Sequence, residues 1–275
     1  MANLTTYFHT TKHLLDSGEI HEKTRPYLGL SGIGHSCSRY LWYSFHWAYL
    51  ASLTKRQRRL FDRGHREEPV ICTLLENIGY TITDEQKEIV TGQGHVKGHI
   101  DGIVHGVVEA PKTPHLAEFK TMKDSKFKEL KKKGTIKAAH PVYYAQAQMY
   151  MHYLDLTRTL FIVANKNDDD LYIERIHYNK DFCKENERRY ESILISADPP
   201  ARAFTRTYFE CKWCDAKGIC HEKLIPEKNC RTCKHVELMV EGQWLCGLYE
   251  SPIPLEFQRI GCDQYKLNQA MQDGE

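Results

Sequence analysis

The chain has 275 residues, of which 41% are hydrophobic, 27% charged and 11% aromatic. This composition supports a folded core and excludes an intrinsically disordered protein. Because no apolar run is long enough to cross a membrane and the first thirty residues are rich in charge, we expect a soluble protein that is not exported. The formal net charge of +2 identifies no partner by itself.

Two helices are predicted in the first third of the chain. The aromatic run that starts at Cys37 turns basic near Leu60, which favours a helix that ends in a cluster of lysine and arginine side chains. Periodic apolar residues in segment 67–80 indicate a second helix. Pro69 would lie in its first turn, and Gly79 would end it.

Short β-branched runs and longer helical patterns then alternate along the chain. Five runs punctuated by Gly and Pro predict an antiparallel meander at the centre of a sheet; they span residues 81–84, 87–92, 96–104, 106–110 and 115–121. We also predict a lysine-rich helix at 123–137 with a mobile loop at Gly134, an amphipathic helix at 141–156, strands on both sides of 167–170, and a helix at 181–196. The order indicates an α/β fold with a central mixed β-sheet flanked by helices.

Acidic residues mark two of these strands and the head of the second helix. Asp101 ends one strand. Glu118 and Lys120 lie two residues apart on a later strand, so their side chains should share one face of the sheet. A plain ion pair would explain Glu118 and Lys120 alone. Together with a carboxylate from Glu67 or Glu68, the acids would form an oxygen site suited to Mg²⁺ or Mn²⁺.

This arrangement resembles the PD-(D/E)xK nuclease superfamily. GHIDG supplies the motif's Asp101, and EFK supplies Glu118 and Lys120. The segment with Gly64 and Glu68 resembles the acidic first motif of phage-type RecB-like exonucleases. The resemblance implies a restriction-endonuclease-like core in which Mg²⁺ or Mn²⁺ is held by a set of three carboxylates and one carbonyl, namely Glu68, Asp101, Glu118 and Phe119. Lys120 would assist the attack of water on the phosphate.

Gln146 and Tyr150 resemble the Q-x-x-x-Y element of the same exonucleases. The resemblance implies that both contact the DNA backbone near the scissile phosphate, whereas a polar helix face is the simpler explanation of the two residues. The implied activity is a metal-dependent DNA exonuclease that acts on single-stranded DNA or DNA ends in phage or bacterial recombination, replication or repair. It would work in the cytoplasm of a bacterial or phage-infected cell.

Seven of the ten cysteines crowd into the last quarter of the chain, after Asp198-Pro199-Pro200. Clustered thiols in a reducing compartment indicate metal. The spacing C-x₂-C-x₅-C places three thiols together, and His221 would complete a Cys₃His zinc site. The group also resembles RecB-like nucleases of the CRISPR-associated and AddB types, in which one early and three late cysteines hold a [4Fe-4S] cluster. The resemblance implies the ligands Cys37, Cys211, Cys214 and Cys220.

A second group has the spacing C-x₂-C-x₁₂-C-x₁₅-C and predicts a zinc knuckle or ribbon that needs its ion to fold. Its four members are Cys230, Cys233, Cys246 and Cys262. Cys72 and Cys183 are expected to pack in the core. We therefore expect two domains: a RecB-like nuclease domain with the iron-sulfur cluster at residues 1–225, and a C-terminal cysteine-rich zinc module at residues 226–275.

Two basic segments flank the predicted acidic site in sequence and could follow a phosphate backbone. The candidate DNA-binding residues are Arg56, Arg59, Lys123, Lys126, Lys131, Lys132 and Lys133. A solvated lysine face is the plain alternative. At the level of the whole protein, the alternative is a zinc-containing DNA-binding or adaptor protein with a degenerate nuclease site. The sequence also leaves open a homo-oligomer or a recombination or replication partner protein.

Overall fold

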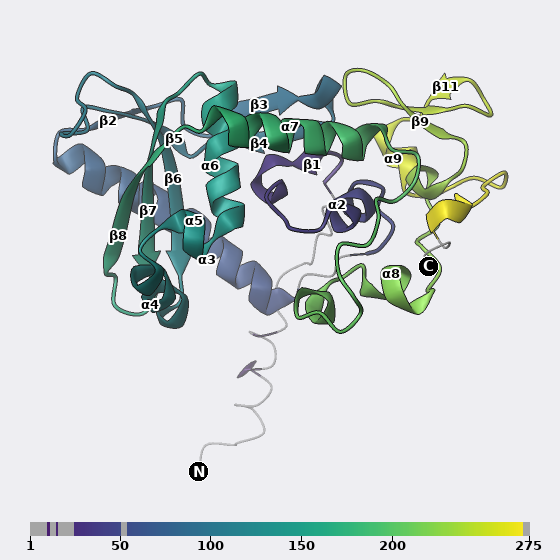
Figure 1. Cartoon of the computed structure of the whole chain (residues 1–275), viewed down its shortest axis with the longest axis horizontal. Coiled ribbons are helices and arrows are strands. Elements are labelled where there is room, and N and C mark those ends of the chain that lie inside the picture. Colours follow the sequence, from purple (N-terminus) through teal and green to yellow (C-terminus); the bar gives the residue numbers. More distant parts are fainter. Residues whose placement is uncertain (1–9, 12–14, 16–24, 51–53, 272–275) are drawn as a thin grey trace, which may run out of the picture.

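The computed structural model describes residues 10–11, 15, 25–50 and 54–271. A mixed five-stranded β-sheet flanked by helices forms one half of the molecule, and two three-stranded sheets lie beside it (Figure 1). The predicted α/β class with a central mixed sheet is thereby confirmed. In the part of the chain that is described, no helix is both long and apolar enough to cross a membrane.

The five-stranded sheet has the strand order β2-β5-β6-β7-β8. Its members are β2 (Thr81–Thr83), β5 (Gly102–His105), β6 (His115–Met122), β7 (Arg158–Asn165) and β8 (Leu171–His177). Within this sheet β6 and β7 pair in parallel and the other neighbours pair antiparallel, because the helices between β6 and β7 carry the chain back across the sheet. The predicted strands on either side of residues 167–170 are confirmed as β7 and β8.

The predicted meander is divided between two sheets. β3 (Glu88–Thr91) and β4 (Val96–His99) pair with β1 (Leu28–Gly29) in a sheet of their own, and residues 106–110 contain no strand. The chain changes sheets after β4, where the Ile100 amide donates to the Lys87 carbonyl at 3.1 Å. The expectation of one continuous meander is therefore wrong.

The helices of the first third also differ from the prediction. α2 (Ser38–Phe45) is short, and α3 (Lys55–Asn77) is a single helix that contains Pro69 in its interior. The basic residues begin α3 instead of ending the preceding helix, because Thr54 and Gln57 form a capping box that fixes the helix start there. Gly79 follows the helix with a φ of 90°, so its predicted role as a stop is confirmed.

The connection from β6 to β7 contains α4 (Asp124–Lys133), α5 (Ile136–Ala139) and α6 (Pro141–Tyr153). Gly134 ends α4 with a φ of 79°. The prediction of an amphipathic α6 is wrong, because all of residues 144–151 are buried. Strands β6 and β7 contact it on one side, and η1 (Leu30–Gly32) and α7 (Lys180–Ile195) contact it on others (Figure 1). A helix enclosed in this way needs no polar stripe.

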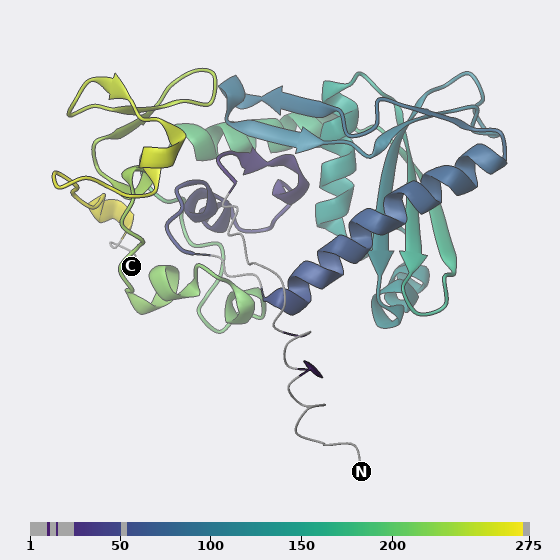
Figure 2. The ribbon, with the colours of Figure 1, turned by 180° about the vertical axis from the view of Figure 1, so that it is seen from behind.

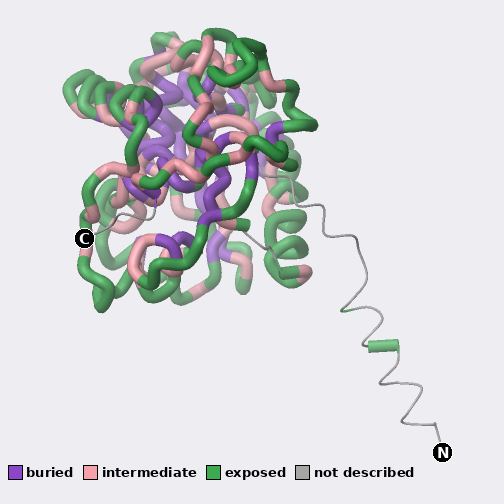
Figure 3. The backbone as a smooth tube through the Cα atoms, turned by 90° about the vertical axis from the view of Figure 1, so that its right-hand side faces the viewer, coloured by how far each residue is buried: buried purple, intermediate pink, exposed green. Residues whose placement is uncertain are grey.

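The C-terminal part contains short elements that pack on the α2 region (Figure 2). Besides η2 (Gly92–Gly94) earlier in the chain, the short elements are η3 (Glu210–Trp213), α8 (Lys217–Glu222), η4 (Cys230–Thr232), β9 (Val236–Leu238), β10 (Trp244–Cys246), β11 (Ser251–Pro252), α9 (Leu255–Gln258) and η5 (Gln269–Met271). Trp244 belongs to the same core cluster as α2 and α6, with its ring 5.0 Å from that of Phe45. Figure 3 shows the buried segments gathered inside a shell of exposed turns. Cys72 and Cys183 are both buried, as expected.

Candidate active site and cysteine clusters

Asp101 and Glu118 meet at the end of the β5–β6 ladder. Gly102, the first residue of β5, pairs with Ala117 of β6, so Asp101 just before the strand lies next to Glu118. The Asp101 carboxylate accepts the Phe119 amide at 2.6 Å and so takes the place of the next backbone partner. This hydrogen bond from the Phe119 amide to the side chain of Asp101 fixes Asp101 beside Glu118.

Glu118 is fully buried on the face of the sheet that α6 covers. Its Oε1 accepts hydrogen bonds from the Lys120 ammonium and, at 2.8 Å, from Gln146 of α6. Its Oε2 is buried and has no hydrogen-bond partner among the described residues. Phe119 points the other way and packs with Ile71 of α3. The prediction that Glu118 and Lys120 share one face of the sheet is therefore confirmed.

Glu68 reaches the same site from α3. Its carboxylate lies 3.4 Å from His65 Nδ1 and accepts a hydrogen bond of 3.2 Å from Gln86 Nε2. The carboxylates of Asp101 and Glu118 both interact electrostatically with Glu68. Of the two adjacent acids in the sequence, Glu68 is the one with these contacts.

Burial controls protonation among these acids. It raises the pKa of Glu118 to about 8, although the Lys120 ammonium opposes the rise. Burial likewise raises the pKa of Asp101 and, with the repulsion of Asp101, that of Glu68. Burial alone would lower the pKa of Lys120, but the carboxylates of Glu118 and Asp101 together raise it. The site thus combines a firmly charged ammonium with acids that hold protons more tightly than usual.

Gln146 and Tyr150 lie behind Glu118, where both are buried. A Cβ at Gly98 would come within 2.6 Å of the Tyr150 ring, so the first glycine of GHIDG lets Tyr150 approach β4 closely. The Lys120 ammonium lies 5.6 Å from the centre of the Tyr143 ring. Contact of Gln146 and Tyr150 with DNA stays a prediction.

Three neighbours of the site are not predicted from the sequence. Tyr143 precedes Gln146 by one turn of α6 and could be found by extending the Q-x-x-x-Y element backwards. His65 stands within the Gly64–Glu68 motif, where its proximity to Glu68 is the available signal. Gln86 gives no signal, since its position depends on a left-handed backbone (φ 55°) in the turn after β2.

All seven candidate DNA-binding residues are exposed or partly exposed. On α4, Lys126 and Lys133 form ion pairs with Glu129 at 2.7 and 2.9 Å, and Lys131 pairs with Asp170 of the β7–β8 turn. Part of the positive charge is therefore balanced locally. Arg56 and Arg59 lie in the first turns of α3.

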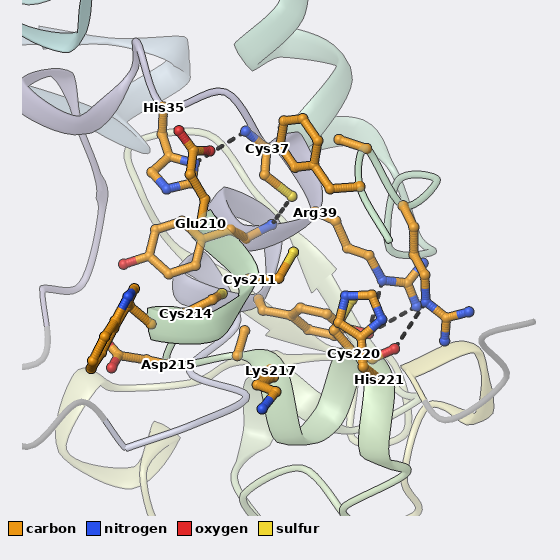
Figure 4. A pocket seen from close by; sticks show the side chains of 17 residues that line it. His35, Cys37, Arg39, Glu210, Cys211, Cys214, Asp215, Lys217, Cys220 and His221 are labelled. Atoms are coloured by element: carbon orange, nitrogen blue, oxygen red, sulfur yellow. Dashed lines mark hydrogen bonds between the residues drawn. The ribbon is translucent and has the colours of Figure 1, made fainter. Parts of the chain in front are cut away.

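The first cysteine group surrounds a cavity of about 130 Å³ (Figure 4). Cys37 is the N-cap of α2, and its sulfur accepts the Tyr40 amide at 3.4 Å. Of the three later cysteines, Cys211 lies in η3, Cys214 directly follows it and Cys220 lies in α8. His221 of α8 also lines the cavity. The structure therefore brings together residues that lie far apart in the described chain.

Arginines hold the backbone around this cavity. Arg189 of α7 donates to Ser38 Oγ at 2.9 Å, to the Ile33 carbonyl at 3.0 Å and to the His35 carbonyl. Arg202 donates to the Cys220 carbonyl at 2.9 Å. These hydrogen bonds tie both the early and the late segment to arginine side chains.

The second cysteine group lines a separate cavity of about 20 Å³. Cys230 and Cys233 flank the η4 turn, in which the Cys233 amide donates to the Cys230 carbonyl at 3.2 Å. Cys246 pairs with Val236 in the β9–β10 hairpin, and Cys262 follows α9. Within the described residues, no three His, Cys, Asp or Glu side chains already stand as they would around a metal ion. The metal assignments at all three sites therefore stay predictions.

Matches to known proteins come from solved structures. No family model matches the chain, and no curated protein matches it in sequence. Among solved structures it is similar to LHK-Exo in complex with dAMP, with 16% identity and a TM-score of 0.45 over 65% of this chain and 91% of that chain. It is also similar to the alkaline exonuclease LHK-Exo from Laribacter hongkongensis, with 18% identity and a TM-score of 0.44 over 62% of this chain and 86% of that chain. A third similar structure is SSO0001, with 16% identity and a TM-score of 0.41 over 81% of this chain and 98% of that chain. At TM-scores this low, none of these similarities carries an argument about this chain.

Proposed function

We propose that this protein is a metal-dependent deoxyribonuclease that hydrolyses phosphodiester bonds at the site of Asp101, Glu118 and Lys120, preferably from DNA ends. The observation that carries the proposal is the buried Oε2 of Glu118, which has no partner among the described residues and lies beside a second carboxylate and an ammonium. A buried carboxylate oxygen without a partner costs free energy, and a divalent cation would remove that cost. The donor set therefore fits Mg²⁺ or Mn²⁺.

Glu68, Asp101, Glu118 and the Phe119 carbonyl are the proposed ligands. A bound cation would supply Lewis-acid activation of the phosphate and of the attacking water. Lys120 would place its ammonium where negative charge develops on phosphorus. Gln146 would hold the Glu118 carboxylate in position through its 2.8 Å hydrogen bond. The basic residues of α3 and α4 would contact phosphates outside the site.

The cavities support different metal centres for the two cysteine groups. Four cysteines line each cavity, and the first cavity, of about 130 Å³, is larger than the second, of about 20 Å³. We propose a cluster that joins the early and late segments of the chain at the first group and one Zn²⁺ at the second.

The test is anaerobic purification followed by metal analysis and a nuclease assay on end-labelled single-stranded and duplex DNA. We expect cleavage with Mg²⁺ or Mn²⁺ and none with EDTA. A protein that binds DNA but cleaves no substrate with either metal would instead support the alternative of a DNA-binding or adaptor protein.

A further inference from the structure

Arg231 is a buried cation without an acidic partner in the described part of the chain. It lies inside the C-x₂-C turn of the second cysteine group and is 1% exposed. Its guanidinium donates to the carbonyls of Phe45 and Pro26, both at 3.0 Å, and to Gln258 Oε1 at 2.9 Å. Its charged neighbour is another cation, Arg259.

The surroundings of Arg231 offset its charge only in part. Its guanidinium carbon lies 3.7 Å from the centre of the Trp47 ring and 4.5 Å from that of Trp244. Neutral acceptors and aromatic rings satisfy hydrogen bonds and attract the cation but supply no counter-charge. An uncompensated buried charge is strongly unfavourable. A negative group close to Arg231 would therefore stabilise the fold.

Cys230 and Cys233, which stand on either side of Arg231 and Thr232 in the chain, share a cavity with Cys246 and Cys262, and these four cysteines can supply that charge. As free thiols they are neutral, but four thiolates around one divalent ion carry a net charge of about −2. We propose that the metal centre of Cys230, Cys233, Cys246 and Cys262 is the counter-charge of Arg231. The guanidinium of Arg231 attracts the negatively charged metal centre toward the core, and the metal centre stabilises the buried position of Arg231 next to α2.

This inference rests on the zinc site proposed above and is independent of nuclease activity. Its structural consequence is a link between the two cysteine groups. Arg231 holds the C-terminal end of α2 through the Phe45 carbonyl, and the neighbouring Asn229 holds the Trp47 carbonyl at 2.9 Å. Cys37 caps the other end of the same helix. A metal ion at the second group thus supports the helix that carries a ligand of the first.

The site itself is tested by metal binding to the full chain. The protein is stripped of metal under reducing conditions and titrated with Zn²⁺, and with Co²⁺ for its visible bands in a tetrahedral thiolate site. We expect Cys246→Ser to bind one zinc fewer than the wild type, and His235→Ala, which changes the other metal-binding side chain at this cavity, to keep the full number. Equal stoichiometry in the wild type and Cys246→Ser would remove the basis of the inference.

The counter-charge is tested with a matched pair of variants. Arg231→Met removes the buried charge, whereas Lys234→Met removes a more accessible charge next to Cys233. We expect Arg231→Met to weaken zinc binding by more than about tenfold and Lys234→Met to change it by less than about threefold, since water and salt screen an accessible charge. Equal effects of the two variants would overturn the proposal.

Arg231→Lys keeps the experiment decisive if Arg231→Met does not fold. Lysine retains the charge but cannot make the three hydrogen bonds of the guanidinium. A counter-charge role predicts zinc affinity close to that of the wild type even where the melting temperature falls. A purely structural role predicts that zinc affinity falls together with the melting temperature, and that result would contradict the proposal.

Discussion

The acidic site draws its central residues from one strand and its neighbours from elements that cover the same sheet, whereas the first cysteine group joins segments that lie far apart in the described chain. Glu118 and Lys120 are held by the hydrogen-bonded ladder between β6 and β7. Cys37 and the segment of Cys211 meet through loops, a short helix and arginine bonds. Replacing a side chain of the acidic site should therefore lower the rate of DNA cleavage, whereas replacing a cysteine of the first group should lower the stability of the fold.

The largest expected effect is on catalysis. Glu118→Gln and Asp101→Asn should each lower the rate of DNA cleavage by about a thousandfold, because they remove metal ligands and charge stabilisation that act in the transition state. Neither should lower the melting temperature by more than a few degrees, since the amides keep the shape of the side chains. Cleavage rates and thermal unfolding of the same preparations measure both quantities.

Glu68→Gln and Glu67→Gln form the matched control. Of these two acids, Glu68 is the one that contacts Gln86 and His65 at the site, so its change should reduce the rate strongly and that of Glu67 should not. A large loss in Glu67→Gln with a normal rate in Glu68→Gln would show that the site has been assigned to the wrong carboxylate.

The converse effect is expected at the first cysteine group. Cys37→Ser should lower the free energy of unfolding by about 3 to 5 kcal/mol and abolish the iron content and brown colour of anaerobic protein, because a link across a very long loop is lost. Activity should fall only as far as the folded fraction falls. A colourless wild type with two zinc ions and no iron would favour a site of Cys211, Cys214, Cys220 and His221.

The difference between the sites also explains what the sequence could predict. Glu118 and Lys120 could be placed on one face because the two-residue period of a strand is local information. That Cys37 lies near Cys211 could be predicted only from a family resemblance, since the spacing of two residues so far apart in sequence gives no information about their distance in the fold. The break between α2 and α3 was predictable in principle, because Thr54 and Gln57 form a capping-box pattern. The division of the meander was not predictable, because it accompanies contacts between residues that are distant in sequence, such as the bond from the Phe119 amide to Asp101.

Metal binding at the acidic site should depend on pH. Because the pKa of Glu118 is raised to about 8, binding of Mn²⁺ must displace a proton below that pH. The Kd for Mn²⁺ should therefore fall up to about tenfold per pH unit from about pH 6 to about pH 8 and then level off. Calorimetric titration of the wild type with Mn²⁺ at each pH measures this, and a flat profile would contradict the raised pKa.

The same group predicts how the metal-free protein responds to pH. Its folded pKa of about 8 exceeds its ordinary value of 4.5, so the folded state binds more protons than the unfolded state between these values. Its contribution to stability is complete below about pH 4.5 and is lost as the pH rises through about 8. Added Mn²⁺ should restore the loss at alkaline pH, and urea unfolding with and without the ion checks the sign.

A smaller effect is expected at the edge of the acidic site. Gln86→Leu removes the hydrogen bond that orients Glu68 and should weaken metal affinity by about tenfold while leaving the fold intact. Lys87→Met in the same turn is the control, since Lys87 bonds to Asp84 instead. If both variants bind Mn²⁺ as tightly as the wild type, the hydrogen bond from Gln86 is not functional.

The smallest effect concerns the exposed lysines of α4. Replacing Lys131, Lys132 and Lys133 with Glu should weaken DNA binding without changing the cleavage rate at saturation, because these side chains lie outside the acidic site. The logarithmic salt slope should fall by about 0.7 to 0.9 for each phosphate that the variant no longer binds. Since Lys131 and Lys133 already pair with Asp170 and Glu129, Lys132→Glu alone should account for most of the change.

Anisotropy at several salt concentrations, with Ca²⁺ in place of Mg²⁺ to suppress cleavage, measures these slopes. If α4 is only a solvated face, the wild type and the triple variant will have identical slopes. If the local ion pairs open to bind phosphate, the slope of the triple variant will fall further than that of Lys132→Glu. The second result would mean that Lys131 and Lys133 leave their carboxylate partners to bind DNA. In that case Asp170→Asn should bind DNA more tightly than the wild type, because Lys131 no longer has to break an ion pair before it contacts the DNA backbone.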